Sequence, residues 1–419
     1  MNISQILLLD KKNLYIDQIF VSGVNFCINI LLIRYLGFEN YGLFFLIWSI
    51  VQFLISTQST LTINPAQSLY PKINKNNRTK YLKNMNFIFL LVNFIIIIIS
   101  LALYYFLKDI LFKNINLQLF LYSCLYFFSF ALHDFLRKLL ILINDISKTL
   151  LIDFVYYSIF LTLLLFFINL GSIDIILVLK ILIVSGFFSS LIGLSISSFS
   201  NVSTKNIKRT FIRNWKSSKW LLFTVATNWF NSNYVFFLTN SLLGLKVIGF
   251  IRAAQNIIGV THILFQLLEN IMPTNLSNLW KLQGIKNMKV YFFKSLSIFT
   301  IIVLIILIII NFYSEQIIKI LYKDFNKNIQ LSLMMFAPMY ILLIFSIFLK
   351  SILRTYENTK PIFFANIVAI IFSLCAGEII INQLNIVGSM LILIGIHLII
   401  FVILSLSVVK NLNENYSRN

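Results

Sequence analysis

The segment FIFLLVNFIIIIISLALYYFL, residues 87–107, decides the fold class of this 419-residue chain. It contains no charged residue, and about 20 consecutive apolar residues are enough for a helix to cross a bilayer. A second segment, LSIFTIIVLIILIIINFY at 296–313, has the same character. Both segments predict helices that span a membrane.

The composition extends this prediction to the whole chain. Hydrophobic residues make up 59% of the sequence and charged residues only 11%, whereas a soluble domain carries about 25% charged residues. We therefore predict an all-α, polytopic membrane protein of about 12 transmembrane helices. The predicted spans lie near 14–34, 41–63, 86–107, 117–138, 149–170, 174–199, 219–243, 247–273, 291–313, 328–349, 361–381 and 386–409.

The charges between these spans predict an orientation. We number each loop by the span that precedes it. The two termini and the even-numbered loops together hold 24 Lys and Arg residues, whereas the odd-numbered loops hold 7. Cytoplasmic loops of membrane proteins carry such an excess, so we expect both termini in the cytoplasm. The lipid bilayer then accounts for the net charge of +20, and no nucleic-acid partner is implied.

Two matches within the chain indicate an internal repeat. YLGFENYGLF (35–44) aligns with LLGLKVIGFI (242–251) at an offset of 207, and FLRKLLILINDISK (135–148) aligns with FLKSILRTYENTKP (348–361) at an offset of 213. Chance recurrence of Leu and Phe is the alternative, but both matches occupy equivalent places in the topology. We predict two pseudo-symmetric six-helix bundles: an N-terminal lobe at 1–200, a basic cytoplasmic linker at 201–218 and a C-terminal lobe at 219–419.

The eighth predicted span carries an unusual polar face. Its central part, IRAAQNIIGVTHILFQLLEN, covers residues 251–270. Wound as a uniform helix at about 100° per residue, it places its strongly polar side chains in one arc of roughly 140°. Such a face must turn toward protein or water. The arc includes Arg252, Gln255, Asn256, His262 and Glu269.

Spans one and seven repeat this polar face without charge. Asn25 lies on span one, and Asn228 and Asn231 lie on span seven. A hydrated cavity lined by spans 1, 2, 7 and 8 is therefore expected, with these side chains as candidate substrate-binding groups. Hydrogen bonds between helices, which small polar residues commonly form in membranes, are the alternative.

Arg252 is the leading candidate for binding an anion, because an arginine inside a span costs roughly 2.5–3.5 kcal/mol on insertion scales. Snorkelling toward the outer surface is its alternative role. His262 and Arg34 are further candidates, although His262 could equally be a neutral, hydrogen-bonded histidine. Asp17 and Glu269 are candidate ion-coupling residues, both expected at shallow positions.

The sequence holds no signature of an enzyme. It has no Walker motif, no GxGxxG after a strand, no HExxH and no CxxC pair. We therefore predict a transporter with no catalytic residues, no metal site and no cofactor.

Three segments carry a resemblance to a known family: DQIFVSGVNFCINILLIRYLGFENYGLFF (17–45), SLLGLKVIGFIRAAQNI (241–257) and LRTYENTKP (353–361). With the twelve-span layout, the chain resembles the O-antigen and capsule flippases. These are the polysaccharide-export branch of the multidrug/oligosaccharidyl-lipid/polysaccharide (MOP) superfamily.

The resemblance implies a flippase that moves undecaprenyl-diphosphate-linked oligosaccharide across the bacterial cytoplasmic membrane by alternating access. Cationic residues would attract the diphosphate, a role that Arg252 matches, and Arg34 less closely. Candidate protein partners are a glycan polymerase and a chain-length regulator. The alternatives are an ion-coupled small-molecule exporter of the same fold and, less favoured, an O-antigen polymerase.

Overall fold

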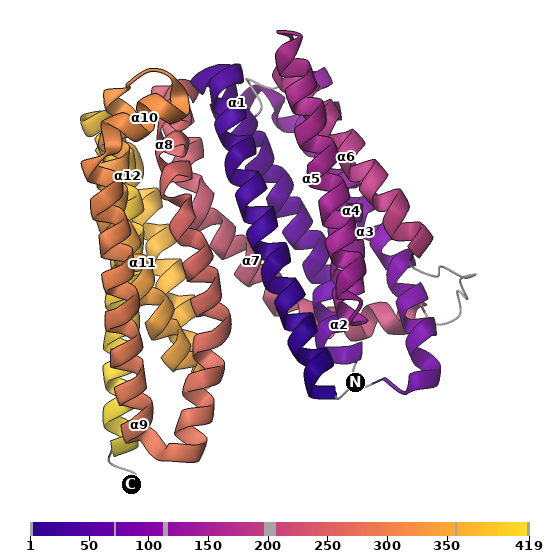
Figure 1. The fold of residues 1–419 in the computed structure, drawn as a ribbon, viewed down its shortest axis with the longest axis vertical. Helices are drawn as coiled ribbons and strands as arrows, with labels where there is room; N and C mark the ends of the chain where they lie inside the picture. The colour runs from indigo at the N-terminus through magenta and orange to yellow at the C-terminus, as the bar shows by residue number, and fades with distance from the viewer. Residues whose placement is uncertain (1–2, 71–72, 112–115, 197–206, 357, 417–419) are drawn as a thin grey trace. The chain divides into compact units, whose positions relative to one another are not determined.

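The protein is built from helices (Figure 1). The computed structural model describes residues 3–70, 73–111, 116–196, 207–356 and 358–416, and every regular element in these ranges is helical. This confirms the all-α prediction. Residues 201–206 of the predicted linker lie outside the described ranges.

The helices are long, as the apolar segments predict. In chain order they are α1 (Ile3–Leu61), α2 (Ile63–Leu69), α3 (Lys75–Leu111), α4 (Leu117–Leu142), α5 (Ile146–Asn169), α6 (Ile175–Ile196), α7 (Ile207–Leu243), α8 (Leu245–Ile258), the 3₁₀ turn η3 (Gly259–Thr261), α9 (His262–Phe312), α10 (Ser314–Tyr322), α11 (Lys327–Thr355) and α12 (Lys360–Tyr416).

Eight helices in the described part of the chain are long and apolar enough to cross a membrane. Two of them, at Phe20–Leu61 and Lys360–Lys410, have 42 and 51 residues, about twice the length that one crossing needs. Each is interrupted by a positive φ, at Gly37 and at Asn385 respectively, and so supplies two crossings. The polar-rich α7 and α8 complete a multi-pass membrane protein of about 12 transmembrane helices.

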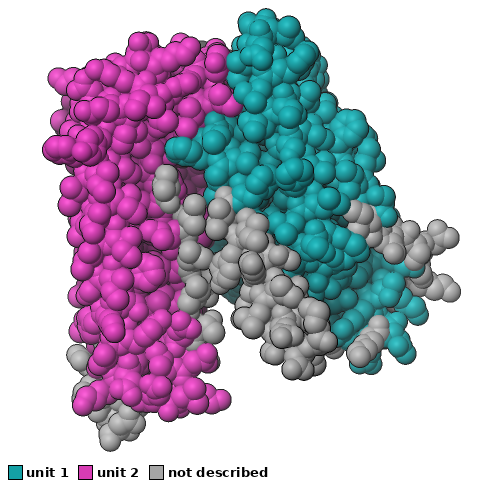
Figure 2. Space-filling model, viewed as in Figure 1, with its two compact units in different colours: residues 1–28, 44–226 teal, residues 29–43, 227–419 magenta. Residues whose placement is uncertain are grey.

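The chain divides into two compact units (Figure 2). Unit 1 contains residues 1–28 and 44–226, and within it α6 packs against both α4 and α5. Buried apolar side chains such as Leu136, Leu140 and Ile152 form part of its core.

Unit 2 contains residues 29–43 and 227–419. Helix α11 is its centre, because it packs against α8, α9 and α12. The unit also includes the Gly37 bend of α1, a piece that belongs to the first half of the sequence. The predicted lobe boundaries stay a prediction.

Candidate functional site

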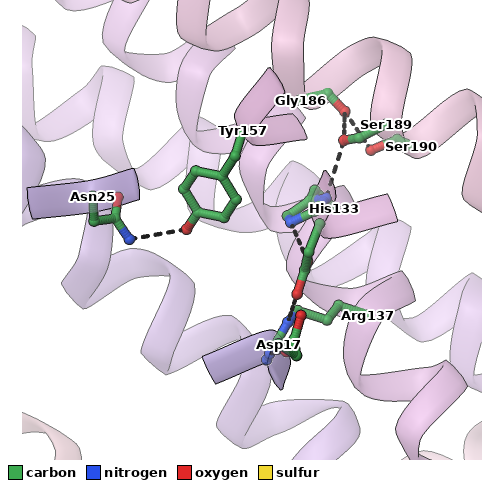
Figure 3. Close-up of polar contacts among 9 residues, drawn as sticks. Asp17, Asn25, His133, Arg137, Tyr157, Gly186, Ser189 and Ser190 are labelled. Carbon is green, nitrogen blue, oxygen red and sulfur yellow. Dashed lines mark hydrogen bonds and ion pairs between the residues drawn. The ribbon is translucent and has the colours of Figure 1, made fainter. Parts of the chain in front are cut away.

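A buried ionic cluster lies in the interior of unit 1 (Figure 3). Helix α4 supplies His133 and Arg137, which are four residues apart and therefore lie on one face of the helix. Asp17 comes from α1 and Asp153 from α5. The Arg137 guanidinium bridges the two carboxylates: Nη2 lies 2.5 Å from Asp17 Oδ2, and Nε lies 2.5 Å from Asp153 Oδ2.

His133 extends the cluster toward α6. Its Nε2 lies 3.2 Å from Asp153 Oδ1, and its Nδ1 lies 3.0 Å from the Ser189 hydroxyl. The Tyr156 ring stacks on the imidazole with 4.7 Å between ring centroids. A continuous chain of polar contacts thus runs from α1 through α4 and α5 to α6.

The charges of this cluster do not balance when His133 is neutral. Two carboxylates face one guanidinium, and the side chains of Asp17 and Asp153 are only 2% and 1% exposed. Asp17 Oδ1 has no hydrogen-bond partner within the described part of the chain. A buried excess negative charge is costly. The cluster is therefore a place where one proton or another cation could be bound.

The predicted internal repeat pairs two residues of this cluster with residues of unit 2. At the offset of 213, Arg137 corresponds to Lys350, and Asp153 corresponds to Asn366 in unit 2. There Asn231 donates hydrogen bonds to the backbone oxygen and to Oδ1 of Asn366, at 3.1 and 3.2 Å. The position of Asp153 is thus matched by a neutral amide in unit 2, whereas the position of Arg137 is matched by another cation.

Arg252 lies on α8 in aromatic surroundings within unit 2. Its guanidinium carbon is 5.7 Å from the centroid of the Phe236 ring on α7, which is within the range of cation–π attraction. It donates a hydrogen bond to Gln255, one turn further along α8. The phenols of Tyr41 and Tyr340 are close enough to interact with it electrostatically. The half-buried guanidinium is thus held among side chains that fix its direction.

The uniform helix expected for 247–273 is wrong in one respect. Helix α8 ends at Ile258, a 3₁₀ turn covers Gly259–Thr261, and α9 begins at His262. Glycine and β-branched residues favour such an interruption, and the Thr261 hydroxyl also bonds back to the Ile258 carbonyl. After the turn, His262 and Glu269 are exposed whereas Phe265 and Leu268 are buried, so polar and apolar residues still lie on different sides of the helix.

The other predicted residues occupy varied environments. Asn25 donates to the Tyr157 hydroxyl at 3.1 Å (Figure 3), and Arg34 donates to the carbonyls of Ile320 and Leu321 at the end of α10. Asn256 is half-buried on α8, and Asn231 is buried. The exposed residues of the predicted set are Asn228, His262 and Glu269.

The structure therefore brings together only part of the predicted set. Arg252, Gln255 and Asn256 share α8, whereas Asp17 and Glu269 belong to different units. Asp17, expected at a shallow position, is buried and ion-paired. Sequence reasoning missed its partners His133, Arg137 and Asp153. The four-residue spacing of His133 and Arg137, and a single acid inside the apolar span 149–170, were the available signals.

Comparison with known proteins bears on the fold. No protein-family model and no curated protein matches the sequence. An inward-facing multidrug resistance MATE family transporter of the MOP superfamily is similar with a TM-score of 0.75 at 12% identity, covering 97% of this chain and 98% of its own. The lipid II flippase MurJ, inward closed, has a TM-score of 0.71 at 14% identity, over 94% of this chain and 87% of its own.

A MOP superfamily transporter from Pyrococcus furiosus is also similar, with a TM-score of 0.63 at 11% identity over 96% of this chain and 94% of its own. Identities this low establish the fold and nothing further. Taken with the helical bundles described above, these similarities show that the chain has the fold of the MOP superfamily transporters.

Proposed function

We propose that this protein is a flippase that moves undecaprenyl-diphosphate-linked oligosaccharide, the repeat unit of an O-antigen or capsule, across the bacterial cytoplasmic membrane. The observation that carries this proposal is the position of Arg252 on α8, held by Phe236 and Gln255 in the interior of unit 2. The similarity to a lipid II flippase supports the same class of cargo.

The chemistry of the cargo explains why such a residue is needed. A diphosphate that carries sugars cannot cross about 30 Å of hydrocarbon without a polar path. The planar guanidinium of Arg252 matches phosphate oxygens and can form paired, charge-assisted hydrogen bonds with them. The side-chain amide of Asn228, which is exposed, can donate to and accept from sugar hydroxyls.

The proposed role is tested in the bacterium that carries the gene. Deleting the gene is expected to remove the surface glycan while undecaprenyl-diphosphate-linked oligosaccharide accumulates in the cytoplasmic leaflet. The two quantities are measured by glycan blotting and by mass spectrometry of extracted lipids. Surface glycan that persists at the wild-type level, without accumulation of the lipid-linked precursor, would contradict the proposal.

Ion-coupled export of a small molecule is a second candidate function. The ionic cluster of unit 1 favours it, because two buried carboxylates share one guanidinium in the ion pairs of Asp17, Arg137 and Asp153. Binding of a proton there would neutralise the excess charge and weaken the bridge between α1 and α5. An ion gradient could thereby change the relative stability of two conformations.

Proton coupling predicts a specific effect of Asp17→Asn. This variant removes the excess carboxylate and keeps the shape of the side chain, so it mimics the protonated cluster. In proteoliposomes, transport of the small molecule by the wild-type protein is expected to rise several-fold when a proton gradient is imposed. The Asp17→Asn variant is expected to show no such rise. Glu315→Gln, which alters an exposed ion pair with Lys319 on α10, is the matched control. A response of Asp17→Asn equal to that of the control would exclude the cluster from coupling.

A further inference from the structure

The first turns of α7 carry small polar side chains on their buried side. Residues 207–218, which belong to the predicted linker, form the start of this helix. Thr210, Asn214 and Ser218 follow one another at intervals of four residues, so they lie along one side of the helix. All three are buried. The side of α7 that packs against the protein here is therefore polar.

Hydrogen bonds within unit 1 fix this side of the helix. Each of the three buried side chains bonds to α1 or α3. The donor–acceptor distances are 3.1 Å from Asn84 to Thr210, 3.0 Å from Tyr81 to Asn214 and 2.7 Å from Ser218 to the Thr60 carbonyl. These bonds set the rotation of α7 about its own axis. They thereby decide which side chains the helix presents outward.

The outward side of the same turns is strongly basic. We name the exposed side of α7 from Lys208 to Trp220 the basic face. Its five cations, all exposed, are Lys208, Arg209, Arg213, Lys216 and Lys219. The sequence has no Asp or Glu at 40–108 or at 175–268, which are the ranges that hold α7 and the parts of α1 and α3 bonded to it. The elements that position the basic face thus supply no counter-charge to it.

Large rings lie among these cations. The Phe211 and Trp215 rings are stacked, with 6.4 Å between their centroids and 16° between their planes. Trp215 is 45% exposed and Trp220 is 70% exposed. Lys219 Nζ lies 5.9 Å from the centroid of the Trp220 ring. Tryptophan among lysine and arginine is typical of helices at the boundary between lipid and water, where the rings and the charges are both accommodated.

The length of α7 agrees with such a location. The helix has 37 residues, from Ile207 to Leu243, and at 1.5 Å per residue it is about 55 Å long. The hydrocarbon core of a bilayer is only about 30 Å thick. The predicted crossing at 219–243 is long enough to pass through it, so the turns before Lys219 lie at the level of the lipid headgroups or beyond.

We propose that the basic face of α7 is a binding site for the phosphate headgroups of anionic phospholipids. Guanidinium and ammonium groups form charge-assisted hydrogen bonds with phosphate oxygens. The rings of Phe211 and Trp215 pack beside the glycerol and the first acyl carbons of the bound lipid. Phosphatidylglycerol, which carries a net negative charge, is preferred over phosphatidylcholine, whose choline cancels the charge of its phosphate. The site takes lipids of the bilayer and does not depend on the proposed cargo.

Quenching of Trp215 by brominated lipids tests this site in the full-length protein. Trp215 becomes the only reporter when the other tryptophans are replaced by phenylalanine at Trp48, Trp220, Trp229 and Trp280. This parent protein is placed in phosphatidylcholine vesicles that contain a minor fraction of either brominated phosphatidylglycerol or brominated phosphatidylcholine. At equal fractions, the brominated phosphatidylglycerol should quench Trp215 about threefold more strongly or better, because it is enriched at the basic face.

Two pairs of lysines separate this site from a general attraction of lipid by positive charge. Lys208→Gln with Lys216→Gln should remove most of the preference for phosphatidylglycerol. The matched control is Lys281→Gln with Lys286→Gln, which removes two exposed lysines of α9 on the side of the membrane predicted for the start of α7. It should keep the preference. The proposal is overturned if the first pair keeps the preference, or if the control pair loses it equally.

Salt provides a second test, in which the other tryptophans stay in place. Here the signal of Trp215 is the difference in quenching between the wild type and Trp215→Phe. Raising the salt concentration from about 0.1 M to 1 M shortens the screening length from about 10 Å to 3 Å. The preference for phosphatidylglycerol should then disappear, whereas quenching by brominated phosphatidylcholine should persist. A preference that salt does not change would assign the contact to the rings alone. Quenching by neither lipid would place the basic face in water or against another protein, and either result would overturn the proposal.

Discussion

Replacing Arg137 with leucine is expected to destabilise the protein by about 3–5 kcal/mol, the range observed when one partner of a buried ion pair is removed. Arg137 is the only cation that bridges Asp17 and Asp153 in the described cluster, and both carboxylates are almost completely buried. Without the guanidinium, two like charges remain inside a helical bundle. Thermal unfolding of the purified protein in detergent, followed by intrinsic fluorescence, measures the loss.

Charge neutralisation should rescue this variant. In the triple variant Asp17→Asn, Arg137→Leu, Asp153→Asn, no uncompensated charge remains, and most of the stability should return. Lys319→Leu is the control, because its ion pair with Glu315 is exposed and such pairs contribute at most about 1 kcal/mol. Equal losses for Arg137→Leu and the triple variant would show that Arg137 acts through packing rather than through charge.

Replacing Arg252 with alanine is expected to lower translocation of the lipid-linked diphosphate about 10- to 100-fold. Hydrogen bonds to charged groups contribute about 1.5–3 kcal/mol, and each 1.4 kcal/mol corresponds to a factor of about ten. Lysine should restore part of the rate, because it keeps the charge but not the planar, paired donors. Initial translocation rates in proteoliposomes, normalised to the amount of inserted protein, measure the effect.

Arg354→Ala is the matched control for Arg252→Ala. It removes an exposed arginine from the end of α11 in the same unit, and we expect translocation to stay within twofold of the wild type. If Arg252→Ala also stays within twofold, Arg252 does not bind the diphosphate. If the translocation rate falls equally in both variants, the loss comes from removing a positive charge anywhere in the unit and not from removing Arg252 in particular.

The helical fold could be predicted because its signals are local. Apolar segments of bilayer length identify most of the crossings, and the positive φ values at Gly37 and Gly244 lie between predicted spans. The repeat at an offset of 207 was also visible as a pattern. The contact between its two copies could not be predicted, because it depends on the packing of segments that are about two hundred residues apart. In this contact Gly42 lies against the backbone of Leu245, and Gly249 lies against the backbone of Phe38.

The ionic cluster shows why the site was harder to predict. Arg137 and Asp17 are separated by 120 residues. From the sequence alone, Arg137 was one of several basic residues in a loop predicted to be cytoplasmic. A lone acid such as Asp153 does not reveal its partner until the helices pack. The 3₁₀ turn at Gly259–Thr261 was missed for a different reason, since a uniform helical period cannot anticipate such a turn.

Translocation of a fluorescent undecaprenyl-diphosphate-linked oligosaccharide in proteoliposomes tests the central claim most directly. The wild-type protein should make the inner-leaflet fraction of the lipid accessible to an external quencher within minutes, whereas protein-free vesicles should not. A diphosphate-free polyprenyl glycoside with the same sugars should move at least tenfold more slowly. If the two lipids move at equal rates, or if the wild type does not exceed empty vesicles, the account of Arg252 as a diphosphate-binding residue in a flippase is contradicted.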